Sequence, residues 1–148
     1  MATRGLCVPF AETIIAESVD RYDRERDRYI KLASRVADLC RGIVDDNAIR
    51  AQVTFRTKTV KSFEGKLRRF AKRPDKNYAS VDEIFAKVGD FAGVRVATYR
   101  PEDEQRVADA IASLFCGPDA SFVEIDPKDK LDPASGQFYR ATHCQVYL

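Results

Sequence analysis

The chain has 148 residues, of which 45% are hydrophobic, and this predicts one compact domain with a modest core. Its 25 basic and 23 acidic side chains nearly cancel, so the net charge of +2 indicates neither a nucleic-acid nor a membrane partner. No stretch reaches the roughly 18 apolar residues needed to cross a bilayer. The four cysteines form no Cys-x-x-Cys pair, which argues against a zinc site. We therefore expect a soluble, cytoplasmic protein.

A long amphipathic helix is predicted from Phe10 to about Asp45. Apolar residues recur there at intervals of three and four, and Arg26 is the one charged residue that interrupts them. The apolar positions are Ile15, Val19, Tyr22, Tyr29, Ala33, Val36, Cys40 and Ile43. We expect this helix to pack on the rest of the domain rather than to form a free coiled coil.

A short strand and a basic helix are predicted next. Residues 51–55 alternate weakly between apolar and polar types and are rich in strand formers. Apolar residues then recur at helical spacing from Val60 to Phe70, and Pro74 ends the helix. The sequence therefore predicts a strand that leads into a basic helix.

The basic helix carries a candidate phosphate-binding face. Residues 56–76 hold nine cations and two acids, a net charge of +7. Ser62 and Lys66 lie four residues apart and share one helix face, with Arg56 and Lys58 just before the helix. Lysine and arginine donate charge-assisted hydrogen bonds to phosphate oxygens, so this face could bind a polyphosphate. The alternative is a solvated basic face that covers a buried apolar stripe.

A short helix and another strand follow. Ser80 and Glu83 are spaced as a capping box, which predicts a helix that ends by Gly89. Residues 91–99 form a near-continuous apolar run, which is typical of a strand buried on both faces. Arg95 inside such a strand needs a partner, either a carboxylate of the chain or a ligand in a cleft. Asp90, just before the strand, could be that partner or could hold Mg²⁺.

Helix and strand continue to alternate in the C-terminal part. Pro101 and the acids after it predict a helix that ends at residues 117–118. The pattern then predicts a strand, a polar loop and a last strand, over residues 121–126, 127–136 and 138–148 respectively. His143 is the single histidine, and from the residues alone a packing role is the simpler interpretation.

Three ordered blocks of residues carry a family resemblance. They are Arg56-x-Lys58-x-x-x-Ser62-x-x-x-Lys66, then Asp90-Phe-Ala-Gly93-Val-Arg95, then Gly136 with Tyr139-Arg140-Ala141-Thr142-His143. Together they resemble the synthetase domain of the RelA/SpoT family, including its small alarmone synthetases. The resemblance implies an α/β (α+β) fold with a nucleotidyltransferase-like mixed β-sheet flanked by helices. Residues 51–148 would form this domain, and residues 1–50 would be an N-terminal helical extension.

The resemblance also implies an activity and a role for each matched residue. The family moves the β,γ-diphosphate of ATP to the 3′-hydroxyl of GDP or GTP and makes (p)ppGpp, with Mg²⁺ as cofactor. The roles implied are Arg56 and Arg95 against the adenine, Lys58, Ser62 and Lys66 on the ATP phosphates, Asp90 as catalytic metal ligand, and Tyr139, Arg140 and His143 on the acceptor side. These roles suit the chemistry, because phosphoryl-type transfer needs mainly positioning and charge stabilisation.

Two departures from the family pattern leave alternatives open. Gly136 is followed by Gln137 and Phe138 before Tyr139, and no strand after the histidine brings the family's second glutamate. We expect the domain to be incomplete at its C-terminus and the chain to be part of a longer enzyme. One alternative is a toxin that pyrophosphorylates the 3′ end of tRNA, with a possible antitoxin partner. Another is a catalytically inactive nucleotide- or RNA-binding module.

Overall fold

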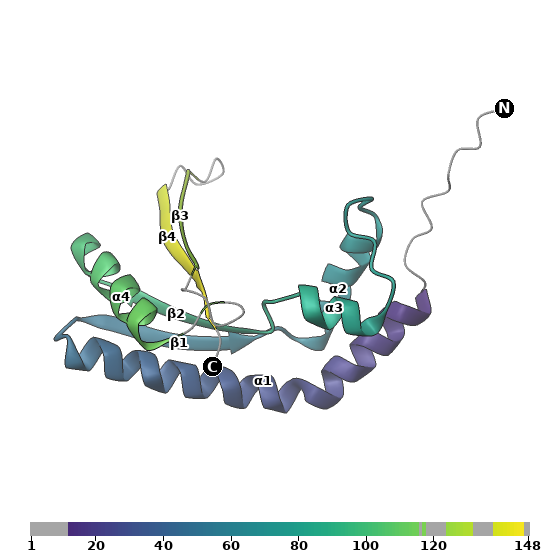
Figure 1. Ribbon diagram of the computed structural model, residues 1–148, viewed down its shortest axis with the longest axis horizontal. Coiled ribbons are helices and arrows are strands. Elements are labelled where there is room, and N and C mark those ends of the chain that lie inside the picture. The colour runs from purple at the N-terminus through teal and green to yellow at the C-terminus, as the bar shows by residue number, and fades with distance from the viewer. Residues whose placement is uncertain (1–11, 116, 118–123, 132–137, 147–148) are drawn as a thin grey trace. The chain divides into compact units, whose positions relative to one another are not determined.

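The computed structural model describes residues 12–115, 117, 124–131 and 138–146 (Figure 1). The fold is α+β with a long N-terminal helix, as the sequence predicted. The elements in chain order are α1 (Glu12–Asp46), β1 (Ala51–Thr57), α2 (Val60–Ala71), α3 (Val81–Lys87), β2 (Ala92–Thr98), α4 (Pro101–Leu114), β3 (Glu124–Leu131) and β4 (Phe138–Gln145). The described strands pair two by two, β1 with β2 and β3 with β4.

The chain divides into two compact units. The first unit comprises Met1–Val36 and Phe55–Val94, and the second comprises Ala37–Thr54 and Arg95–Leu148. Helices α2 and α3 belong to the first unit, whereas α4, β3 and β4 belong to the second. Helix α1 and strands β1 and β2 contribute residues to both. The boundary at residue 50 between an extension and a synthetase domain stays a prediction.

Helix α1 confirms the predicted amphipathic helix. It spans Glu12–Asp46, and Ile15, Tyr22 and Ala33 from its apolar stripe are buried. Arg26, which interrupts that stripe, is half-buried. Among the described helices, none combines the length and the apolar character that crossing a membrane requires.

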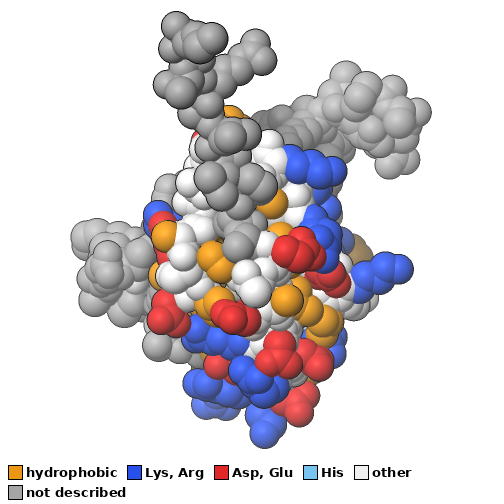
Figure 2. Space-filling view, turned by 90° about the vertical axis from the view of Figure 1, so that its right-hand side faces the viewer, with side chains coloured by type: hydrophobic (Ala, Val, Ile, Leu, Met, Phe, Trp, Pro, Cys, Tyr) orange, Lys and Arg blue, Asp and Glu red, His pale blue; other side chains and the backbone are white. Residues whose placement is uncertain are grey.

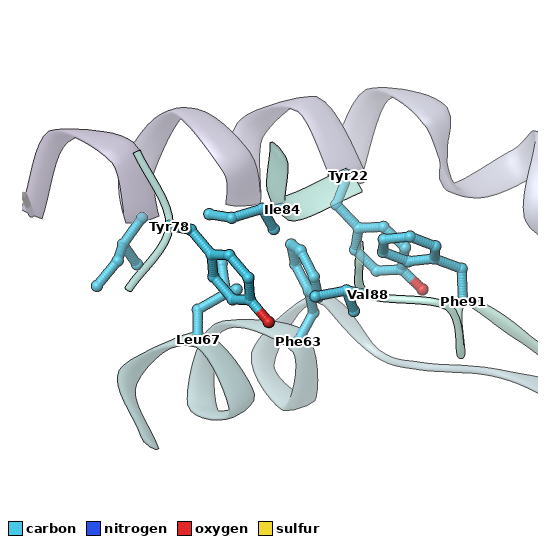
Figure 3. Packing of buried hydrophobic residues seen from close by; sticks show 8 residues of the cluster. Tyr22, Phe63, Leu67, Tyr78, Ile84, Val88 and Phe91 are labelled. Carbon is cyan, nitrogen blue, oxygen red and sulfur yellow. The ribbon is translucent and has the colours of Figure 1, made fainter. Parts of the chain in front are cut away.

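An aromatic core holds the first unit together. Tyr22 of α1, Phe63 and Leu67 of α2 and Ile84 of α3 are fully buried, and Figure 3 shows Tyr22 and Phe63 pointing into one shared space. The ring of Phe63 lies 4.6 Å from the ring of Tyr22 and 5.6 Å from that of Phe91. Burying rings of this size supplies most of the stabilisation in so small a unit. The predicted apolar spacing of the basic helix is thereby confirmed.

Side-chain caps begin both short helices of the first unit. The hydroxyl of Thr59 accepts a hydrogen bond from the Ser62 amide at 3.1 Å and begins α2. Ser80 caps α3 in the same way, accepting from the Glu83 amide at 3.1 Å. The Glu83 carboxylate reaches back to the amide of Ala79 at 2.7 Å, one residue earlier than in a standard capping box. The predicted helix start at Ser80 is confirmed.

Strand β2 is exposed on one face, so the prediction of a strand buried on both faces was wrong. Ala92, Val94 and Val96 are half-buried and alternate with exposed residues, of which Arg95 is one. Among the described residues β2 pairs with β1, and an antiparallel sheet of this kind commonly leaves one face to solvent. The pairing is antiparallel, because Tyr99 N–H donates to the Arg50 carbonyl and a Cβ added at Gly93 would lie 3.8 Å from the Arg56 carbonyl oxygen.

The second unit has its own core and a hairpin. Val44, Ile49 and Val107 are buried together. Strands β3 and β4 pair antiparallel from Glu124 opposite Gln145 to Leu131 opposite Phe138. Residues 127–131, predicted as part of a polar loop, therefore belong to a strand, because cross-strand pairing overrides their polar composition. The predicted strand residues 121–123 lie outside the described part of the chain.

Ser18 provides a stability test of the first unit. Its hydroxyl is fully buried on α1 and has no hydrogen-bond partner among the described residues. A buried hydroxyl without a partner costs free energy, so we expect Ser18→Ala to raise the free energy of unfolding by about 1 kcal/mol. Urea unfolding measures the change, and Ser34→Ala, at a half-buried position of the same helix, is the control. A loss of stability in Ser18→Ala alone would show that the hydroxyl has a partner after all.

Candidate functional site

Three of the predicted site residues converge in the first unit. The ammonium nitrogen of Lys66 lies 2.6 Å from Asp90 Oδ1, and that of Lys58 lies 3.2 Å from Asp90 Oδ2. The lysine side chains are only 18% and 23% exposed, whereas the Asp90 side chain is 54% exposed. We name this group the Lys58–Lys66–Asp90 cluster. It joins Lys58 and Lys66 of the basic segment to Asp90, which lies two residues before β2.

Local structure explains why each member of the cluster points where it does. Lys58 lies between the end of β1 and Thr59, the N-cap of α2. Lys66 lies on α2, four residues after Ser62, and its ammonium is 5.5 Å from the centre of the Phe70 ring. Asp90 precedes Phe91, whose buried ring anchors that stretch of backbone in the aromatic core.

The two lysines keep Asp90 ionised. Partial burial of Asp90 opposes its ionisation, but the hydrogen bonds and charges of Lys66 and Lys58 outweigh it and hold the pKa of the carboxyl below its ordinary value. The negative charge of Asp90 thus offsets one of the two lysine charges, so the cluster keeps a net positive charge. Because its lysines are mostly enclosed and already oriented, an anion would meet donors that need little reorganisation.

The lowered pKa of Asp90 predicts a pH-dependent contribution to stability. This contribution is fully present above the unfolded pKa of about 4 and is lost as the pH falls through the lower folded value. At neutral pH we expect Asp90→Asn to reduce the free energy of unfolding by about 0.5–1 kcal/mol, the range of a partly exposed ion pair. Urea unfolding of both chains at a series of pH values measures this difference. A difference that persists unchanged well below pH 4 would contradict the ion-pair explanation.

Two residues of α1 contact the cluster from outside the predicted set. The Tyr22 hydroxyl donates a hydrogen bond to the backbone carbonyl of Lys58 at 2.8 Å, and Arg26 Nε donates to the same oxygen at 3.1 Å. Sequence reasoning did not assign these residues to the site. The one signal was Arg26 itself, a charged residue within an apolar stripe.

Arg56 and Ser62 lie in the same unit but do not join the cluster. Both side chains are exposed, and within the described residues neither has a hydrogen bond or ion pair to Lys58, Lys66 or Asp90. The Ser62 amide is used by the N-cap of α2. Their predicted roles against the adenine and on the phosphates stay predictions.

The remaining predicted residues lie in the second unit. Arg95 is exposed on β2 and, within the described residues, has no ion pair, so the expected buried partner is not needed. His143 is exposed on β4 opposite Asp126. The backbones of Tyr139 and Arg140 pair with β3, and their side chains lie outside the described part of the structure. The structure therefore leaves their joint action with the cluster as a prediction.

A pocket of about 530 Å³ also belongs to the second unit. Residues of α1 and α4 line it, among them Leu39, Ile43 and Leu114. None of the predicted site residues lines this pocket. It therefore adds nothing to the predicted nucleotide site.

The cluster by itself supplies too few ligands for a magnesium ion. Mg²⁺ prefers six oxygen ligands, and among the described residues no group of three or more acidic, histidine or cysteine side chains could hold a metal ion. Asp90 offers one carboxylate, and both of its oxygens already contact lysine ammonium groups. Phosphate oxygens and water would have to supply the other ligands, which is how Mg²⁺ commonly binds with nucleotides.

Acidic side chains divide the basic surface around the cluster. Arg68 of α2 contacts Glu12 at 2.8 Å and Glu64 at 2.9 Å, and Arg73 contacts Asp75 at 2.8 Å. Figure 2 shows the same mixture, with blue cationic side chains among red carboxylates on one face of the molecule. Glu64 and Asp75 are already counted in the charge of +7 over residues 56–76, whereas Glu12 and Asp90 lie outside that segment and offset part of this charge.

Comparison with protein-family models, with curated proteins and with solved structures found no match to this chain. The likeness to the RelA/SpoT synthetase domain therefore rests on the three blocks of residues in the sequence.

Proposed function

We propose that the Lys58–Lys66–Asp90 cluster binds the triphosphate of ATP with its Mg²⁺. In this proposal the protein is a cytoplasmic RelA/SpoT-type pyrophosphokinase that transfers the β,γ-diphosphate of ATP to the 3′-hydroxyl of GDP or GTP. One observation carries the proposal: two largely enclosed lysines, one just before α2 and one on it, meet on one half-exposed carboxylate. Such a group matches the charge of a metal-bound triphosphate, with cations for its oxygens and a carboxylate for its metal.

The proposed reaction needs little from the protein beyond position and charge. The acceptor 3′-hydroxyl releases its proton to water and its oxygen attacks the β-phosphorus of ATP, the bond from that phosphorus to the α-phosphate oxygen breaks, and AMP leaves. Lys58 and Lys66 would donate hydrogen bonds to the phosphate oxygens and offset the charge that develops on the transferred and leaving groups. Magnesium, when bound with the nucleotide, would neutralise further charge on the phosphates. Asp90 would orient both lysines before the nucleotide arrives.

A tRNA acceptor is the second candidate, and exposed cations favour it. Lys61, Arg69 and Lys72 are exposed on or next to α2, and within the described residues none of them has an ion pair. Such side chains are free to contact an RNA backbone, and contacts of this kind give a binding affinity that falls steeply with salt. Labelling of tRNA from γ-labelled ATP would favour this acceptor over a guanine nucleotide.

A product assay tests the proposed function. The chain is incubated with MgATP and GDP, GTP or tRNA, and we expect one AMP for each 3′-pyrophosphorylated acceptor. Asp90→Asn should abolish this product, because the metal-bound phosphates lose their carboxylate and the lysines lose their common partner. Asp82→Asn is the matched control. Asp82 is not a member of the cluster, and its carboxylate pairs with Arg21 at a distance of 2.9 Å.

The outcomes of the assay separate the candidates. ATP binding without AMP from any acceptor would support a binding module over an active enzyme for this chain. Absence of ATP binding would reject the proposed site altogether. An equal loss of product in Asp82→Asn and Asp90→Asn would show that the effect is not specific to the cluster.

A further inference from the structure

One backbone carbonyl in the first unit accepts two side-chain hydrogen bonds. The Tyr22 hydroxyl lies 2.8 Å from the Lys58 carbonyl oxygen, and Arg26 Nε lies 3.1 Å from it. Tyr22 and Arg26 are four residues apart and therefore share one face of α1. A carbonyl oxygen has two lone pairs, so these two donors can satisfy it fully.

Lys58, which carries this carbonyl, lies outside the hydrogen-bonding pattern of any helix or strand. Lys58 follows the last residue of β1 and precedes the N-cap of α2, so neither the strand nor the helix sets its backbone. Two donors from a packed helix fix the plane of its peptide group. The direction in which the Lys58 side chain leaves the backbone is fixed with it, and that side chain ends 3.2 Å from Asp90.

The same face of α1 also packs against the neighbour of Asp90. The ring of Tyr29 stacks on Phe91 at 4.8 Å, and the ring of Tyr22 lies 5.5 Å from Phe91. Phe91 directly follows Asp90 in the chain. Helix α1 therefore holds the backbone on both sides of the Lys58–Asp90 ion pair.

A packing role alone does not explain Arg26. A half-buried guanidinium in an apolar stripe costs free energy unless it is paired, and leucine would fill that position without this cost. The donated hydrogen bond to Lys58 gives the arginine a specific partner. Tyr22 likewise directs its one polar atom at this carbonyl, while its ring is fully buried.

We propose that Tyr22 and Arg26 are positioning residues for the nucleotide site, acting through the backbone carbonyl of Lys58. This inference rests on the proposed function. In this proposal α1 contributes two residues that support the nucleotide site, so it is more than an N-terminal extension. The two side chains hold the Lys58 ammonium where it meets Asp90, and a bound triphosphate would receive a cation that is already in place.

Single substitutions that spare the packing test this proposal. Tyr22→Phe removes only the hydroxyl, and Arg26→Met removes the guanidinium but keeps an unbranched apolar side chain. Each should weaken MgATP binding by about five- to tenfold, the effect of one hydrogen bond, as measured by calorimetry. Arg26→Lys, which keeps a donor, should restore part of the loss. Arg28→Met, at an exposed position of the same helix, should bind MgATP like the wild type.

Two further measurements separate positioning from general damage. In a Lys58→Met background, Tyr22→Phe and Arg26→Met should weaken binding no further, because the group they position is gone. In the absence of ligand, both variants should shift the ¹³C resonance of the Lys58 carbonyl and increase the mobility of the Lys58 side chain in NMR relaxation. Equal losses of affinity in the wild-type and Lys58→Met backgrounds would overturn the proposal, as would an unchanged Lys58.

The positioning role and the proposed function fail in different ways. If the wild type does not bind MgATP, the proposed function is rejected. The ligand-free NMR data then decide the positioning role by themselves. A Lys58 that becomes mobile in both variants supports the role, and a Lys58 that stays rigid overturns it.

Discussion

The Lys66→Met variant is expected to bind MgATP about tenfold or more weakly than the wild-type chain. A charge-assisted hydrogen bond contributes more than a neutral one, and the predicted loss corresponds to about 1.5 kcal/mol or more. Methionine keeps a long apolar side chain that can still pack near Phe70, so the change removes mainly the ammonium group. Calorimetric titration at fixed salt measures the affinity.

Lys61→Met is the matched control for this prediction. Lys61 is exposed on the same helix and, among the described residues, has no ion pair. It carries the same charge, so a loss caused only by lower positive charge would be similar in both variants. Such a similar loss would argue against a specific site at Lys66 and for general attraction of an anion.

The Phe63→Ala variant should lower the free energy of unfolding by about 3–5 kcal/mol, as large-to-small substitutions of buried aromatic residues do. Phe63 is fully buried, and its ring packs between those of Tyr22, Phe85 and Phe91. Removing the Phe63 ring leaves a cavity next to Phe91, the residue that follows Asp90 in the chain. Denaturant unfolding, followed by the circular dichroism of the helices, measures the loss.

Phe55→Ala is the corresponding control, because the Phe55 side chain is 40% exposed on β1. We expect a much smaller loss there, since less apolar surface is withdrawn from water. Equal losses in the two variants would contradict the placement of the core in Figure 3.

The helices were the part of the fold that the sequence predicted well. Long runs of apolar residues at intervals of three and four identified α1 and the apolar side of α2, because one face of each helix packs against a core. Ser80 identified the start of α3 through its local hydrogen bond to Glu83. These signals lie within a few residues of one another, so no knowledge of the tertiary fold is needed to read them.

The strands were predicted less well because their burial depends on distant partners. An apolar run from Phe91 to Tyr99 indicates a strand, but it does not reveal that one face of that strand is exposed. That missing fact made Arg95 look buried when it is exposed. Residues 127–131 likewise look like a loop until the pairing with β4 is known.

Part of the candidate site could be predicted from the sequence, and part could not. The family resemblance implied that Lys58, Lys66 and Asp90 serve one site, and the ion pairs that join them were seen only in the structure. The hydrogen bonds from Tyr22 and Arg26 to Lys58 join residues 36 and 32 positions apart and end on a backbone atom. No residue type marks a backbone acceptor, and the interruption of the apolar stripe at Arg26 was noted without a role for that residue.

NMR titration with MgATP, observed at the lysine side chains, tests the central claim most directly. If the Lys58–Lys66–Asp90 cluster binds the triphosphate, the side-chain signals of Lys58 and Lys66 shift and saturate together. Those of Lys61 and Lys72, which are exposed and lie outside the cluster, change little. Saturating MgATP that leaves Lys58 and Lys66 unchanged, or that shifts all four lysines alike, would contradict the claim.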